Sequence, residues 1–136
     1  MVNLPIESAP QKAKPPKKGE NVTITPKNSN KPLVMLESPY AGNVEGNLTY
    51  ARRCMRDSLK RGEVPLASHL LYTQEGILND DDPIERELGI GSGFDWGNNA
   101  DYIVFYDDFG MSGGMQVAEI YYKSIAKPVF FRKLFT

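Results

Sequence analysis

Short apolar segments alternate with helical patterns from residue 33 onward, and this alternation limits the possible folds more than any other feature. Four of the segments have the length and composition of buried strands, and they span residues 33–38, 64–68, 102–106 and 128–131. Strands that alternate with helices along the chain build a parallel sheet that is covered by helices. We therefore predict an α/β fold.

Helix-capping residues set the limits of the segments between these strands. The predicted helices run from Asn43 to Gly62, from Asp82 to about Trp96, and from about Gly114 to Ala126. In the first of them, apolar residues recur at spacings of three and four, which is typical of a helix that packs one face on a sheet.

The first 32 residues differ in composition from the rest of the chain. They contain six of the ten prolines, and six lysines against two glutamates, so their net charge is +4 and that of the remainder is −5. We predict a Lys/Pro-rich N-terminal tail at 1–32 and one domain at 33–136. A short alternation at residues 22–25 is a candidate edge strand, and the tail is a candidate contact for a subunit or an acidic partner. The acidic balance of the domain argues against nucleic-acid binding.

Cys54 is the only cysteine, so the sequence predicts no intramolecular disulfide, and a reducing compartment fits. No segment approaches the length of about 18 apolar residues that a membrane span needs. The lysines near the N-terminus are not followed by an apolar segment, as they would be in a secretory signal. We expect no membrane association and a cytoplasmic location.

The first candidate binding loop follows the first strand. Ser38, Pro39, Tyr40, Ala41 and Gly42 offer a hydroxyl group, a ring for stacking, and small residues that let a ligand approach backbone N–H groups. These features favour a phosphate or sugar site. The alternative is a tight turn from strand to helix with Tyr40 in the core. The lysine of a P-loop is absent.

The second candidate loop follows the third strand, so the two loops are expected to form one cleft. It contains Asp107 and Asp108, then Ser112, Gly113, Gly114 and Met115 at the start of the last helix, where unpaired N–H groups favour an anion. Glu119 lies about one turn further along. It is a candidate nucleophile or general base, or alternatively a charge that compensates the helix dipole on a solvated face.

Three further polar positions lie near this predicted cleft. His69 is the only histidine and follows the second strand, where it can bind phosphate or hydroxyl groups or serve a structural role. The three aspartates at 80–82 suggest either Mg²⁺ or, as we favour, a helix cap. Arg86 faces the cleft or forms a surface ion pair. We predict no metal and no cofactor.

Together these residues resemble the nucleoside 2-deoxyribosyltransferase-like superfamily, in an uncharacterised branch that is common in phages and bacteria. The resemblance covers roughly residues 33 to 130. It rests on the order and spacing of Ser38–Gly42, Asn47, Ala51, Pro65, Ser68–Leu70, Asp82, Glu85–Gly89, Ser112–Met115 and Glu119.

This resemblance implies a flavodoxin-like or Rossmann-like parallel sheet of four to five strands with helices on both faces, and a nucleoside or nucleotide held over the strand ends. It implies that Glu119 attacks the anomeric carbon, that Asp107 or Asp108 handles the proton of the leaving base, and that Tyr40 orients the sugar. Asn47 is expected near the ligand. A homo-oligomer is also implied, and the host cytoplasm as location if a phage encodes the chain.

One spacing departs from this pattern. Relatives place the carboxylate six residues after the Ser or Asp of the loop, whereas Glu119 lies seven residues after Ser112. One extra residue turns a side chain on a helix by about 100°. The sequence therefore leaves three hypotheses open. The first is an enzyme that cleaves or exchanges an N-glycosidic bond, as a hydrolase or a deoxyribosyltransferase. The second is a non-catalytic nucleotide binder, such as a phage protein that sequesters a nucleotide signal. The third is a partner-binding protein that acts through its tail.

Overall fold

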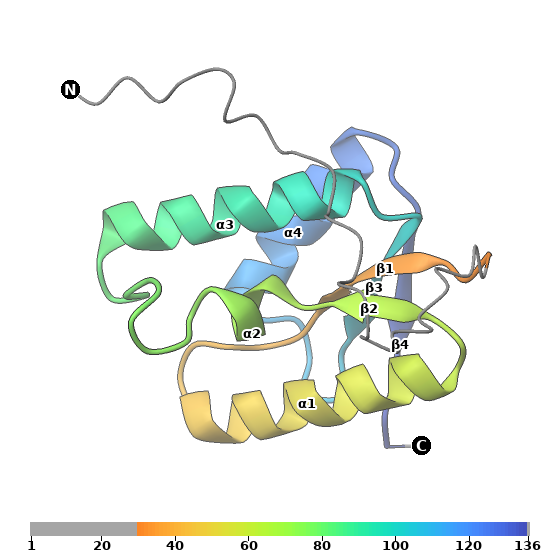
Figure 1. The fold of residues 1–136 in the computed structure, drawn as a ribbon, viewed down its shortest axis with the longest axis horizontal. Coiled ribbons are helices and arrows are strands. Elements are labelled where there is room, and N and C mark those ends of the chain that lie inside the picture. Colours follow the sequence, from red (N-terminus) through yellow and green to blue (C-terminus); the bar gives the residue numbers. More distant parts are fainter. Residues whose placement is uncertain (1–29, 136) are drawn as a thin grey trace, which may run out of the picture.

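A computed structural model describes residues 30–135 and has the predicted α/β architecture (Figure 1). Most of the predicted tail, with the alternation at 22–25, lies outside the described residues. In chain order the elements are β1 (Leu33–Glu37), α1 (Val44–Lys60), β2 (Val64–Leu66), α2 (Ser68–Leu71), α3 (Pro83–Asn98), β3 (Tyr102–Tyr106), α4 (Gly113–Ser124) and β4 (Val129–Arg132).

The four strands form one sheet in the order β2-β1-β3-β4, and every neighbouring pair is parallel. This is the flavodoxin-like strand order. The predicted parallel sheet is therefore confirmed, with four strands in the described part of the chain. Because β1 pairs with β2 on one side and with β3 on the other, the chain reverses its direction of winding between β1 and β3.

Helices cover both faces of the sheet, with α1 on one face and α3 and α4 on the other (Figure 1). The inner strands are apolar on both faces, as parallel strands usually are. Val34 and Leu36 pack toward α1, and Met35 packs toward α3 and α4. The sheet therefore separates two apolar cores.

Local sequence explains where the elements begin and end. The Asn43 side chain accepts a hydrogen bond from the backbone of Gly46 at the start of α1, and Asp82 accepts one from Ile84 at the start of α3. The strand β2 ends at Leu66, earlier than predicted, because Ser68 begins the short helix α2. Pro65 lacks an N–H group and is tolerated because β2 is an edge strand.

Glycine allows α3 and α4 to pack closely. A Cβ atom added at Gly97 would lie 2.0 Å from the hydroxyl oxygen of Tyr122, which is fully buried. The ring of Phe94 stacks on that of Tyr121, with 4.2 Å between ring centroids. These two contacts hold the helices together on the face of the sheet that carries the candidate site.

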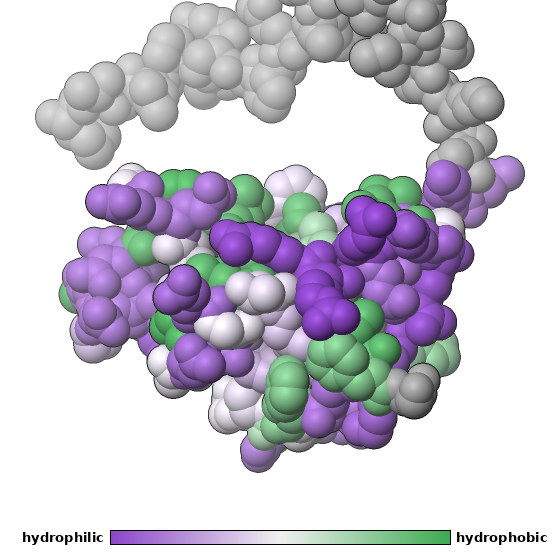
Figure 2. Space-filling view, turned by 90° about the horizontal axis from the view of Figure 1, so that it is seen from below, coloured by the Kyte–Doolittle hydropathy of each residue, from purple (hydrophilic) through white to green (hydrophobic). Residues whose placement is uncertain are grey.

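The outer surface of α1 is hydrophilic and basic. Figure 2 shows this side of the molecule, where large hydrophilic areas dominate. Arg52, Arg53, Arg56 and Lys60 are all exposed there, although the domain as a whole is acidic. None of the helices in residues 30–135 has the length and apolar character needed to cross a membrane.

Candidate functional site

A cavity of about 340 Å³ opens at the carboxyl end of β1. The loop after β1 forms one wall, α2 and α3 form another, and the start of α4 closes the third side. It lies at the β1/β3 boundary, where the winding direction reverses and where α/β sheets of this type bind ligands. Ten of the predicted site residues line the cavity or an adjoining depression: Ser38, Tyr40, Ala41, Gly42, His69, Arg86, Ser112, Gly113, Gly114 and Met115.

Ser38 and His69 meet inside this cavity. The Oγ atom of Ser38 lies 2.7 Å from Nε2 of His69, so the two side chains share a hydrogen bond whose direction follows the histidine tautomer. Burial lowers the pKa of His69 to about 4, which leaves the imidazole neutral at pH 7. The pair therefore offers uncharged donor and acceptor groups, which suit ligand hydroxyl groups or base nitrogens.

Asn47 positions the loop after β1. Its side-chain amide donates hydrogen bonds to the backbone oxygens of Tyr40 and Ala41, at 2.9 and 3.0 Å. Asn47 does not line the cavity, so its role is to hold the loop on α1. Pro39 is buried and also lies outside the lining. Gly42 has a φ of +94°, a conformation that side chains rarely adopt, and it turns the chain into α1.

The start of α4 supplies the opposite wall. The Ser112 hydroxyl accepts a hydrogen bond from the backbone N–H of Met115 at 3.3 Å, while Gly113 and Gly114 leave the first turn without side chains. Arg86 lines the cavity from α3 and pairs with Asp80, with 3.5 Å between Nη1 and Oδ2. These groups can bind an anion such as a phosphate.

Glu119 lies outside the cavity. Its Oε2 atom pairs with Nζ of Lys123 at 2.5 Å, one turn further along α4. Ala118, six residues after Ser112, is buried and lines the cavity instead. The extra residue has thus not been absorbed by the loop, and a methyl group occupies the place where the resemblance leads us to expect a carboxylate.

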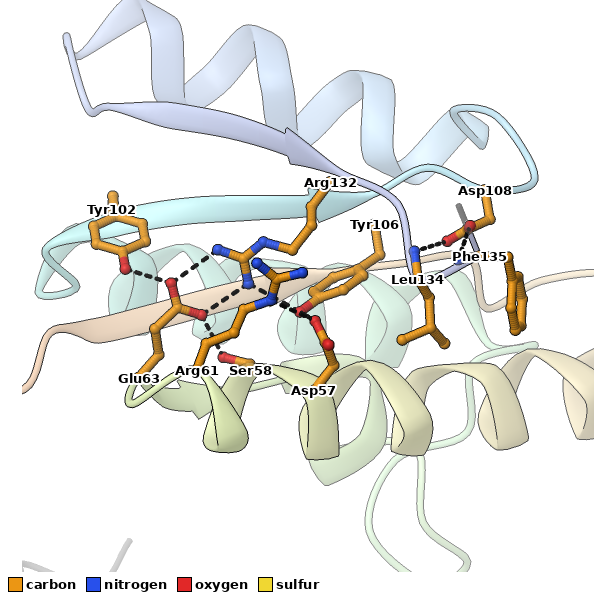
Figure 3. Close-up of polar contacts among 10 residues, drawn as sticks. All are labelled: Asp57, Ser58, Arg61, Glu63, Tyr102, Tyr106, Asp108, Arg132, Leu134 and Phe135. Atoms are coloured by element: carbon orange, nitrogen blue, oxygen red, sulfur yellow. Dashed lines mark hydrogen bonds and ion pairs between the residues drawn. The ribbon is translucent and has the colours of Figure 1, made fainter.

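Asp107 and Asp108 also lie outside the cavity. Asp107 pairs with Lys133 at 3.0 Å. The carboxylate of Asp108 accepts hydrogen bonds from the backbone N–H groups of Leu134 and Phe135, both at 2.8 Å (Figure 3). It also accepts one from the Tyr50 hydroxyl. Asp108 therefore anchors the C-terminal segment to the end of β3.

A carboxyl group that the sequence analysis did not single out does line the cavity. Glu37 is the last residue of β1, and it lies on the face of the sheet that carries α3 and α4. Burial raises the pKa of Glu37 to about 8, so the group carries a proton at neutral pH. The available signal was the strand pattern: an inner parallel strand is apolar on both faces, and Glu37 interrupts that rule.

A second polar cluster lies between the end of α1 and the sheet (Figure 3). Glu63 accepts hydrogen bonds from Ser58, Tyr102 and Arg132, and Arg132 also donates to the hydroxyl of Tyr106. Because these groups satisfy one another, the cluster has the character of a structural network. In residues 30–135 no group of three or more His, Cys, Asp or Glu side chains is arranged to hold a metal ion.

Comparison with known proteins gives one match. No curated protein and no solved structure is significantly similar to the chain. A family model described as "Domain of unknown function (DUF7768)" matches residues 32–132. This range contains all four strands, all four helices and the cavity. The chain therefore belongs to the DUF7768 family.

Proposed function

We propose that this protein binds a nucleoside or nucleotide in the cavity at the ends of β1 and β3. The observation that carries the proposal is the convergence of residues from both strand-end loops on one cavity at the point where the winding direction reverses. Its volume of about 340 Å³ is in the usual range for small-molecule sites.

The lining groups divide into three kinds that suit the three parts of a nucleotide. Aromatic and apolar side chains, among them Tyr40, Phe94 and Met115, offer surfaces on which a base can stack. The Ser38–His69 pair offers neutral hydrogen-bonding groups for a sugar. Arg86 and the start of α4 offer a cation and unpaired N–H groups for a phosphate.

Binding without cleavage is the function that the site supports best. The glutamate expected as nucleophile is paired with Lys123, and Ala118 stands in the cavity. Cleavage or exchange of an N-glycosidic bond is the second candidate, and the observation that favours it is the Glu37 carboxyl group in the cavity wall. A protonated carboxyl group at that position can act as a general acid toward a leaving base.

Calorimetry and chromatography on the same samples test both candidates. The wild-type protein should bind at least one member of a panel of nucleosides and their mono- and diphosphates, and chromatography should detect no released base. The variant Tyr40→Ala should bind the same ligand at least tenfold more weakly. The matched aromatic control is Phe109→Ala, because Phe109 is 67% exposed and lies outside the cavity. Base release by the wild type would establish the enzyme, and failure to bind any member would overturn the proposal.

The resemblance also leads us to propose a homo-oligomer in the cytoplasm. Exposed apolar side chains on α3 and α4 support this, since Ile84 is 79% exposed, Leu88 60% and Ile120 71%. Light scattering behind size-exclusion chromatography measures the mass. A monomer at all concentrations would contradict the oligomer.

A further inference from the structure

Glu37 is the last residue of an inner strand, where it is half-buried and lines the cavity. Side chains on the same face of the sheet are apolar and buried: Met35 on the same strand, and Ile103 and Phe105 on β3. In the β1–β3 register Glu37 lies directly beside Phe105. An acidic side chain is rarely placed among such neighbours unless it is paired.

Within residues 30–135, the carboxyl group of Glu37 has neither a hydrogen bond nor an ion pair. The titratable and charged groups on the elements around it are otherwise engaged. His69 on α2 shares a hydrogen bond with Ser38, and Arg86 on α3 pairs with Asp80. From α4, the neighbouring titratable group is the hydroxyl of Tyr122, which is buried and carries no charge at neutral pH. Among the residues that the structure describes, no cation therefore faces Glu37 to stabilise its charged form.

The protonated state follows from this environment. With the pKa of Glu37 raised to about 8 by burial, most molecules carry a neutral carboxylic acid at pH 7. A neutral carboxylic acid has one O–H donor and one carbonyl acceptor side by side. An ionised carboxylate has acceptors alone. At neutral pH the Glu37 side chain therefore offers the cavity an O–H donor next to a carbonyl acceptor.

We propose that Glu37 is a specificity-determining residue that pairs through two hydrogen bonds with the edge of a base. The edge that it fits presents an acceptor beside a donor, such as a ring nitrogen next to an exocyclic amino group. The Glu37 hydroxyl donates to the ring nitrogen, and its carbonyl oxygen accepts from the amino group. This inference rests on the proposed nucleoside or nucleotide binding and names the part of the ligand that Glu37 recognises.

The hydrogen bond from Glu37 is lost when the group ionises. If the ionised form does not bind, a pKa of about 8 gives roughly a tenfold loss of affinity between pH 7 and pH 9. The probes are adenosine and cytidine, because their bases do not titrate in this range. Glu37→Gln keeps a donor beside an acceptor but does not titrate, so its affinity should stay near that of the wild type at pH 7 and change little at pH 9.

Glu37→Leu keeps the approximate side-chain volume at this half-buried position and removes both hydrogen bonds. It should remain folded, as checked by circular dichroism, and bind at least tenfold more weakly at pH 7. The matched control is Glu45→Gln on the exposed start of α1, which should follow the wild type at both pH values.

The outcomes separate the inference from the proposed function. Wild-type protein that binds no nucleoside or nucleotide overturns both. Wild-type protein that binds, while Glu37→Gln and Glu37→Leu bind equally well, overturns the role of Glu37 alone. The role of Glu37 is also overturned if Glu37→Gln loses affinity between pH 7 and pH 9 as steeply as the wild type does.

Discussion

The side chains of neighbouring residues on a helix point about 100° apart. For this reason Ala118 faces the cavity, whereas Glu119 lies on another side of α4. The methyl group of Ala118 lines the cavity, while the Glu119 carboxylate is neutralised by Lys123. Ser112 caps α4 and residues 113–119 all belong to the helix, so one residue of extra spacing after Ser112 decides whether the carboxylate faces the cavity. The chemistry of this site therefore depends on this spacing as much as on the residue types.

We predict that Glu119→Gln leaves ligand affinity within about twofold of the wild type. It removes only a partly exposed ion pair, whose contribution to stability is less than about 1 kcal/mol. Calorimetry with the ligand found in the panel measures the affinity, with Tyr40→Ala as the positive control for loss of binding. A large loss of affinity or of base release in Glu119→Gln would restore Glu119 to the site.

The lining residues that follow the ends of β1, β2 and β3 could be predicted, because ligand sites of parallel sheets form where strands end. Ser38, Tyr40, His69 and Ser112 are of this kind. Glu37 was missed because it lies within the strand and not on the loop, where its orientation depends on the face of the sheet that it occupies. The partners of Asp108 could not be predicted, because the backbone groups of residues 134 and 135 are distant from it in sequence.

At the scale of elements, the strands and helices could be predicted almost in full. Apolar runs identify the four strands, and capping residues such as Asn43 and Asp82 identify two helix starts. The short helix α2 could not be predicted, because four residues carry too little periodicity. The close approach of α3 to α4 also depends on a contact between elements that local patterns do not contain.

That approach yields a prediction about two glycines on α3. Gly97→Ala places a Cβ against the Tyr122 ring, so it should destabilise the fold by about 1–3 kcal/mol. The matched control is Gly91→Ala, where nothing lies within 4 Å, so the change should stabilise by about 0.5–1 kcal/mol. Urea unfolding of both variants measures the difference. Equal effects in the two variants would show that the helices do not meet at Gly97.

The polar network around Glu63 predicts how stability changes with acid. Arg132, with Tyr102 and Ser58, lowers the pKa of Glu63 from 4.5 to about 2. Because the pKa is lower in the folded state, Glu63 stabilises the fold above about pH 4.5 and this contribution is lost as the pH falls toward 2.

We therefore expect Glu63→Gln to lower the free energy of unfolding by about 3 kcal/mol at pH 7, because the substitution leaves the charge of Arg132 without its partner. Its stability should also fall less steeply than that of the wild type between pH 5 and pH 2. Denaturant unfolding at several pH values measures both effects. The control is Arg61→Gln, which breaks an exposed pair and should cost less than about 1 kcal/mol. Parallel pH profiles for Glu63→Gln and wild type would contradict the role of the network.

At the scale of the whole molecule, we expect the two ends of the chain to contribute unequally to thermal stability. Residues 1–29 contain few apolar side chains to offset the cost of ordering them, so a chain that starts at residue 30 should keep the melting temperature of the full chain within about 2 °C. Removal of residues 133–136 should lower it by more than about 5 °C, because Asp108 loses two backbone partners and Tyr50 loses the ring of Phe135. Scanning calorimetry compares the two. If the N-terminal truncation lowered the melting temperature more than the C-terminal one, the N-terminal residues would be part of the folded unit.

The pairing of β1 with β3 links two segments that residues 38–101 separate along the chain. Joining such distant segments is a slow step in folding, because the intervening chain must be closed into a loop before the contacts can form. The cavity exists only after this step, since its walls come from both sides of the junction. A molecule bound there must lose its contacts before the two strands can separate, so the residence time of the ligand and the lifetime of the folded chain become coupled quantities.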